Sequence, residues 1–169
     1  MKNIKRSKFR ELLISECRIC FEKFFDDEEK KKSEESMEKK LLFNKKLFGN
    51  LDFVGELYRR TLLPNNVIFQ VFESLLGIAN HDIEDLLIEG GVNIMNKAGD
   101  QFEVNTRDSQ KFRERYEIVM NKFETYMNYP DETKVSNRIK MLIKNMFANK
   151  DSNWEKTKEK NKSGPKTKA

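Results

Sequence analysis

The sequence predicts an all-α protein, because its composition and the spacing of its apolar residues both favour helices. Of its 169 residues, 37% are hydrophobic and 36% are charged, a balance typical of amphipathic helices with one buried stripe. Seven Gly and three Pro are too few for the regularly spaced turns of a compact β domain. Apolar residues recur at intervals of three and four along most of the chain, and its length suits one domain.

Six helical segments follow from this spacing. The apolar stripes end at polar or turn-forming stretches, and they predict helices at 8–25, 39–63, 65–76, 82–95, 107–127 and 133–149. Pro64 ends the second segment, and Asn65 or Asn66 can cap the third. Between the first two segments, residues 26–40 have almost no apolar side chain. We therefore expect a solvated helical extension or a mobile loop there.

Glycines inside the predicted helices need an explanation, since each costs about 1 kcal/mol relative to alanine in a helix. For Gly49 and Gly55 we expect the close approach of a neighbouring helix. Gly90 and Gly91 are expected to kink the fourth helix or end it early. Residues 99–106 then form a connector.

The order of the segments predicts how they pack. The connector after Leu63 is a tight hairpin, and antiparallel helix pairs of about 40 to 47 residues are the period of HEAT repeats. Six such helices leave a bundle or an α-solenoid, and we expect residues 1–150 to stack antiparallel pairs as a HEAT-type α-solenoid. Residues 151–169 lack the apolar periodicity, and we expect a C-terminal extension with Trp154 and a polar, basic tail.

The excess of positive charge lies at the two ends of the chain. The formal net charge is +5, with basic residues gathered at 2–10 and 156–168. Such ends favour contact with phosphate or with an acidic protein surface, and solubility alone also explains them. The sequence has no apolar run of about 18 residues, as a membrane helix needs, and no apolar signal segment follows the basic start. We therefore expect a cytosolic or nuclear protein without membrane contact.

No constellation of residues predicts catalysis or a cofactor. Cys17 and Cys20 lie on an apolar stripe and lack two further ligands for a zinc site, so buried thiols are the simpler interpretation. His81, the one histidine, precedes Asp82 at an expected helix start, where a capping turn is simpler than a catalytic dyad. Glycine-rich phosphate loops are absent from the sequence. We expect no enzyme activity and no cofactor.

Trp154, the sole tryptophan, lies beyond the last apolar helix among polar residues. Two interpretations are open. It is an anchor that folds back onto the last helix pair, or it is an exposed aromatic of the kind that forms interface hot spots. The two are compatible.

Five short segments, in order along nearly the whole chain, carry a family resemblance. The most specific are GNLDFVGELY at 49–58 and the ending formed by SNW at 152–154 and GPKT at 164–167. The others are FRELL at 9–13 with Cys17 and FEK at 21–23, NHD at 80–82, and SNRIK at 136–140. Together they resemble the middle domain of translation initiation factor 4 gamma. We expect the chain to start within the second of that domain's five repeats.

The resemblance implies a HEAT-repeat scaffold of translation initiation. Such a scaffold binds and stimulates the DEAD-box helicase initiation factor 4A and contacts mRNA, with initiation factor 3 as a further partner. The resemblance assigns Trp154 to the helicase interface, with Asn153 beside it, and Arg138 is a weaker assignment for contact with the helicase or with RNA. For RNA contact we expect the lysines of the tail: Lys156, Lys158, Lys160, Lys162 and Lys166. The alternative is an RNA-binding or mRNA-metabolism adaptor with the same fold and other partners.

Overall fold

The computed structural model describes the backbone of residues 2–78 and 83–162. Within these ranges it describes the side chains of all residues except 2–7 and 27–30. Within these ranges the chain is helical and has no strand, which confirms the predicted all-α class. The elements are α1 (Lys2–Glu22), the 3-10 helix η1 (Lys23–Phe25), α2 (Asp27–Glu34), α3 (Met37–Arg59), α4 (Asn65–Leu75), α5 (Asp85–Thr106), α6 (Gln110–Met127), α7 (Asn137–Asp151) and α8 (Glu155–Lys162).

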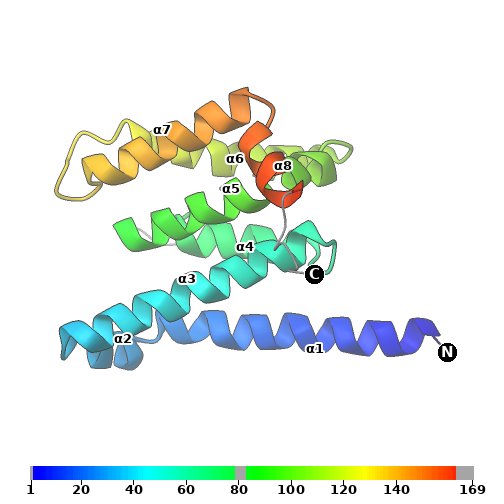
Figure 1. Ribbon diagram of the computed structural model, residues 1–169, viewed down its shortest axis with the longest axis horizontal. Helices are drawn as coiled ribbons and strands as arrows, with labels where there is room; N and C mark the ends of the chain where they lie inside the picture. The colour runs from blue at the N-terminus through cyan, green and yellow to red at the C-terminus, as the bar shows by residue number, and fades with distance from the viewer. Residues whose placement is uncertain (1, 79–82, 163–169) are drawn as a thin grey trace, which may run out of the picture.

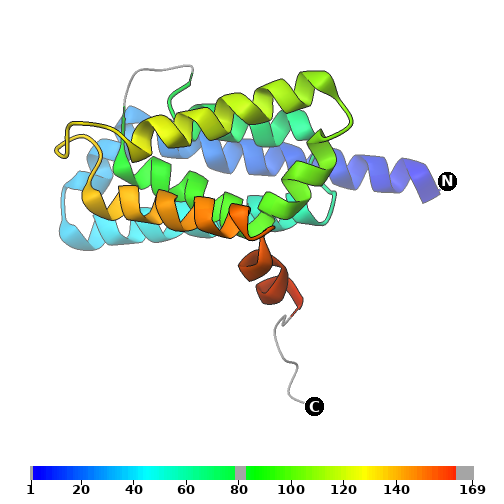
Figure 2. The ribbon, with the colours of Figure 1, turned by 90° about the horizontal axis from the view of Figure 1, so that it is seen from above.

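The long helices form two layers of antiparallel pairs. In chain order the pairs are α1 with α3, α4 with α5, and α6 with α7, and they stack from the bottom to the top of Figure 1. Figure 2 shows α1, α4 and α6 in one layer and α3, α5 and α7 in the other. The short α8 lies outside the second layer and contacts α5 and α7. Stacked antiparallel pairs are the arrangement expected of a HEAT-type solenoid.

The core is one apolar cluster in which α5 has the central place, because α5 contacts α3, α4, α6, α7 and α8. Phe102 of α5 is fully buried. Its ring centroid lies 5.0–5.7 Å from those of four other aromatic rings: Tyr58, Phe69, Phe72 and Tyr116. Aromatic pairs at such distances add about 0.5–1.5 kcal/mol beyond the burial of their area. Phe102 therefore joins the two layers.

Helix α5 is longer than expected. It continues through Gly90 and Gly91 and includes residues 99–106, so the expected early end and the expected connector were both wrong. The two glycines are buried where other helices come close. A Cβ atom would lie 2.5 Å from Leu51 Cδ1 at Gly90 and 3.2 Å from Phe123 Cζ at Gly91. Packing, and not helix termination, explains glycine at these two positions.

In α3 the expected close approach is found at one glycine only. Gly55 is buried, and a Cβ atom there would lie 3.4 Å from the side chain of Lys97. Gly49 is exposed, and nothing lies within 4 Å of the position of its missing Cβ. The expectation for Gly49 was therefore wrong.

Helices are found at 27–34 and at 155–162. Of the two alternatives for 26–40, the helical extension is the one observed, since α2 spans 27–34 and Ser36 then caps α3 by accepting a hydrogen bond of 3.1 Å from the Lys39 N–H. Beyond α7, residues 155–162 of the expected polar tail form the helix α8.

Two helix starts differ from the sequence-based boundaries. Helix α5 begins at Asp85 with Glu84 as its N-cap, and the expected capping turn at His81 and Asp82 lies outside the described residues. Helix α7 begins at Asn137 instead of 133, because the Ser136 hydroxyl accepts a hydrogen bond from a backbone N–H one turn later.

Candidate interaction surfaces

The turn between α7 and α8 holds Trp154 in the interior. Asn153 and Trp154 have φ angles of 59° and 58°, the left-handed region that costs a non-glycine residue about 1–3 kcal/mol. Trp154 is only 1% exposed, and its ring lies over Gly99 of α5. A Cβ atom at Gly99 would lie 2.5 Å from Cη2 and 2.6 Å from Cζ3 of that ring. Of the two interpretations of Trp154, the buried anchor is the one observed.

A buried polar network fixes α8 beside this ring. The Asn149 Nδ2 donates to the Thr157 hydroxyl at 2.9 Å, and that hydroxyl donates to the carbonyl of Asn96 in α5 at 2.6 Å. The Asn149 Oδ1 accepts from the Lys156 N–H at 3.2 Å. One α8 turn further, the Asn161 Nδ2 donates to the Lys97 carbonyl at 3.2 Å. Helix α8 is therefore a docked element, tied to both α5 and α7.

The lysines predicted to contact RNA are divided between two faces of α8. Lys156 and Lys160, one helical turn apart, line a groove with α3, α5 and α7. Lys158 and Lys162 do not line this groove; Lys162 is exposed and Lys158 is half-buried. Lys166 lies outside the described residues.

Arg138 does not join Trp154 and Asn153 in one site. It is at the first turn of α7, whereas Trp154 follows the last, so about 20 Å of helix separates them at 1.5 Å per residue. The two Arg138 guanidinium nitrogens donate to the Glu89 carboxylate of α5 at 2.6 and 3.0 Å. The structure thus places Arg138 in a bidentate ion pair between α5 and α7.

The groove that Lys156 and Lys160 line has a volume of about 1070 Å³. Its two acidic side chains, Asp52 and Glu56 of α3, form ion pairs with basic side chains of the same protein. The Lys97 ammonium lies 2.8 Å from Asp52 and 3.4 Å from Glu56. A hydrogen bond from Arg60, together with nearby positive charge, holds the pKa of Glu56 below its usual value. The groove lining carries five basic side chains against these two acids: Arg59, Arg60, Lys97, Lys156 and Lys160.

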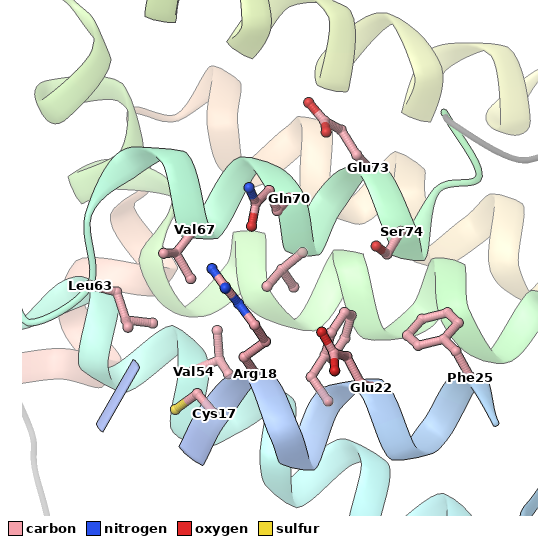
Figure 3. A pocket seen from close by; sticks show the side chains of 12 residues that line it. Cys17, Arg18, Glu22, Phe25, Val54, Leu63, Val67, Gln70, Glu73 and Ser74 are labelled. Carbon is pink, nitrogen blue, oxygen red and sulfur yellow. The ribbon is translucent and has the colours of Figure 1, made fainter. Parts of the chain in front are cut away.

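A second cavity, of about 330 Å³, opens between α1 and α4 (Figure 3). Apolar side chains line its interior, among them Val54, Val67 and Leu63, and Cys17 lies at its α1 wall. Arg18 and Glu22 of α1 lie at its rim. Cys17 is buried as expected and Cys20 is half-buried. In the described part of the chain no three His, Cys, Asp or Glu side chains gather as a metal site.

Cys17 is expected to react slowly in the folded protein. Burial, together with the nearby Cys20 and Glu16, raises the pKa of the Cys17 thiol, so little thiolate is present at pH 8. Alkylation by iodoacetamide, followed by mass spectrometry, should be at least about tenfold slower at Cys17 in native protein than in urea. Equal rates in the two conditions would mean that Cys17 is accessible.

The comparison with protein families agrees with this architecture. Residues 2–153 match the model of the MIF4G domain. This range includes both helical layers and ends at Asn153, one residue before Trp154. The chain belongs to the MIF4G-domain family. This confirms the resemblance to the middle domain of initiation factor 4 gamma, and membership in this family of scaffold domains agrees with the expectation that the chain is not an enzyme.

Relatives of this MIF4G domain are translation initiation factors. It is 32% identical over 121 residues to the initiation factor 4F subunit p150 of Saccharomyces cerevisiae, covering 70% of this chain and 12% of that protein. It is 28% identical over 161 residues to initiation factor 4 gamma of Dictyostelium discoideum, covering 90% and 11%. With the Arabidopsis thaliana factor 4G it shares 24% identity over 165 residues, covering 91% and 9%.

The chain therefore spans about a tenth of the length of the curated relatives it matches. The search of solved structures gave no match. None of the helices at 2–78 and 83–162 combines the length and the apolar character that a membrane crossing requires.

Three residues that hold Trp154 and α8 against α5 and α7 were not predicted from the sequence: Gly99, Asn149 and Thr157. A signal for them was present. Within the charged segment 154–161, the uncharged residues Trp154, Thr157 and Asn161 follow the helical spacing i, i+3 and i+7. This pattern predicts a docked face, although it contains only one apolar residue. Gly99, by contrast, could be recognised only from the ring that covers it.

Proposed function

We propose that this MIF4G domain is a cytoplasmic translation initiation scaffold that binds and stimulates the DEAD-box helicase initiation factor 4A. The observation that carries the proposal is the family match over residues 2–153, together with relatives that are all initiation factors. mRNA is proposed as a second partner and initiation factor 3 as a third. A scaffold needs no catalytic side chain, because it acts by binding one arrangement of a two-lobed enzyme more tightly than the others.

The helicase interface is proposed at the turn that Trp154 anchors. Asn153 is exposed in this turn. The next residue, Trp154, is buried and fixes the backbone of the turn. Trp154 therefore acts by positioning the turn and α8. Arg138, about 20 Å away along α7, is a separate contact whose guanidinium is shared with Glu89.

For mRNA we propose contact through the α8 lysines and Lys166. Lys158 and Lys162 lie outside the groove, and Lys156 and Lys160 add positive charge along the same helix. Such contact neutralises phosphates and weakens as salt concentration rises.

The helicase interface is tested by Asn153→Gly. Glycine tolerates the φ of 59° at this position, so the variant removes the carboxamide without adding backbone strain. We expect binding of initiation factor 4A, measured by surface plasmon resonance, to weaken about fivefold, the value of one lost hydrogen bond.

The matched control is Asn121→Ala, which removes an exposed carboxamide on α6, in the opposite layer. Its affinity should equal that of the wild type. An unchanged affinity for Asn153→Gly would exclude Asn153 from the interface. Binding of RNA without any binding of the helicase would favour the adaptor alternative.

A further inference from the structure

The groove between α3, α5, α7 and α8 contains polar side chains that the proposed function does not use. Asn93 and Asn96 extend from α5 and Asn145 from α7; all three are exposed and line the groove. Within the ranges 2–78 and 83–162 their carboxamides make no hydrogen bond. The carboxamides of Asn149 and Asn161 beside them bind groups inside the protein. The groove therefore presents three available amides, two of them about one turn apart on α5 and the third on α7.

Carboxamides match the hydrogen-bonding groups of an extended peptide. An asparagine side chain offers a C=O acceptor and an N–H donor side by side, the same pair that each peptide group offers. Packed helices lie about 8–10 Å apart, and an extended chain rises about 3.3 Å per residue. Asn side chains on the adjacent helices α5 and α7 would thus meet an extended segment about every third residue.

The charge of the groove indicates which net charge such a peptide should carry. Asp52 and Glu56 are already held by Lys97, Arg59 and Arg60 on the α3 side. On the α8 side, Lys156 and Lys160 add positive charge. Acidic side chains facing α8 would therefore complement the groove.

A nucleic acid strand fits this lining less well. Single-stranded nucleic acid is bound on aromatic platforms that stack its bases. Phe48 is the one aromatic residue among the groove-lining side chains of the described chain, and it is half-buried. Phe48 and Leu142 instead offer apolar contact for small side chains of a peptide.

We propose that this groove binds an extended, acidic peptide segment of a partner protein. Its main chain pairs with the carboxamides of Asn93, Asn96 and Asn145, and its carboxylates face Lys156 and Lys160. The inference does not rest on the helicase proposal, because the groove and the Asn153 turn are tested by different variants. It shares Lys156 and Lys160 with the proposed mRNA contact, and a peptide bound in the groove leaves Lys158 and Lys162, outside it, for RNA.

The probe is a fluorescein-labelled ten-residue peptide of alternating Glu and Thr, in which the β-branched Thr favours an extended chain. Fluorescence anisotropy with the full chain should show saturable binding. A Lys–Thr peptide of the same length should bind at least about tenfold more weakly, since it meets the positive groove with the wrong charge.

Double variants of the asparagines and of the lysines separate main-chain pairing from simple charge attraction. Asn93→Ala with Asn145→Ala removes no charge and should weaken binding about fivefold or more. Its control is Asn121→Ala on α6, which should bind as the wild type does. Lys156→Ala with Lys160→Ala should weaken binding, whereas Lys158→Ala with Lys162→Ala, outside the groove, should have a smaller effect.

A peptide N-methylated at alternate residues adds an internal check. It should bind the wild type more weakly and should lose little further affinity in the Asn93→Ala/Asn145→Ala variant. Three results would overturn the proposal: unchanged affinity in that variant, equal binding of the Lys–Thr peptide, or a ten-nucleotide oligouridine that binds the same groove more tightly than the acidic peptide.

Discussion

Replacement of Trp154 by alanine should destabilise the domain by about 3–5 kcal/mol, the usual cost of truncating a fully buried large aromatic side chain. The ring is 1% exposed and fills the space above Gly99. Its loss leaves a cavity and releases the turn at Asn153, while the left-handed backbone at position 154 stays unfavourable for alanine. Urea unfolding followed by circular dichroism measures the change.

The matched control for this variant is Met141→Ala on α7, because the Met141 side chain is 55% exposed. Its free energy of unfolding should stay within about 0.5 kcal/mol of the wild type. Trp154→Phe should lie between the alanine variant and the wild type. If Trp154→Ala is as stable as Met141→Ala, then Trp154 does not anchor α8.

A pair of glycine variants should change stability in opposite directions. Gly99→Ala puts a methyl group within 2.8 Å of three atoms of the rigid Trp154 ring, so either α8 must move or α5 must bend. We expect a loss of about 1–3 kcal/mol, the usual cost of overpacking. Gly49→Ala meets nothing within 4 Å and should gain up to about 1 kcal/mol, since alanine favours a helix interior.

Thermal unfolding of the two variants beside the wild type measures this contrast. In the double variant Gly99→Ala with Trp154→Phe, the smaller ring should recover part of the lost stability, because the clash is with the outer ring atoms of tryptophan. A Gly99→Ala protein that is more stable than the wild type would contradict the close packing of Trp154 on α5.

The helical class and most of the core could be predicted from apolar spacing alone. Ile68, Phe69 and Phe72 in α4 are buried as the dense apolar pattern of that segment indicates. The pattern failed where a residue has a role that only a neighbouring helix defines. Gly90 reads as a helix breaker in sequence, whereas in the fold it makes room for Leu51.

The candidate site was predicted less well than the fold, because sequence does not show what covers a side chain. Trp154 stood out in the sequence, but whether it is buried depended on Gly99, which lies 55 residues earlier in the chain. The five tail lysines looked equivalent as a charge run. Helix α8 distinguishes the four that the structure describes, since of these Lys156 and Lys160 line the groove and Lys158 and Lys162 do not. Nothing in the sequence around Arg138 indicated that Glu89 would be its partner.

The proposed stimulation of a DEAD-box helicase by this MIF4G domain is tested by the ATPase rate of initiation factor 4A, measured with RNA present. The wild-type chain should raise that rate in a saturable way, and Asn153→Gly should require a higher concentration for the same stimulation. Asn121→Ala should behave as the wild type. An ATPase rate that stays at the level of the helicase alone, at every concentration of the folded wild-type chain, would show that the domain is not a helicase-stimulating scaffold.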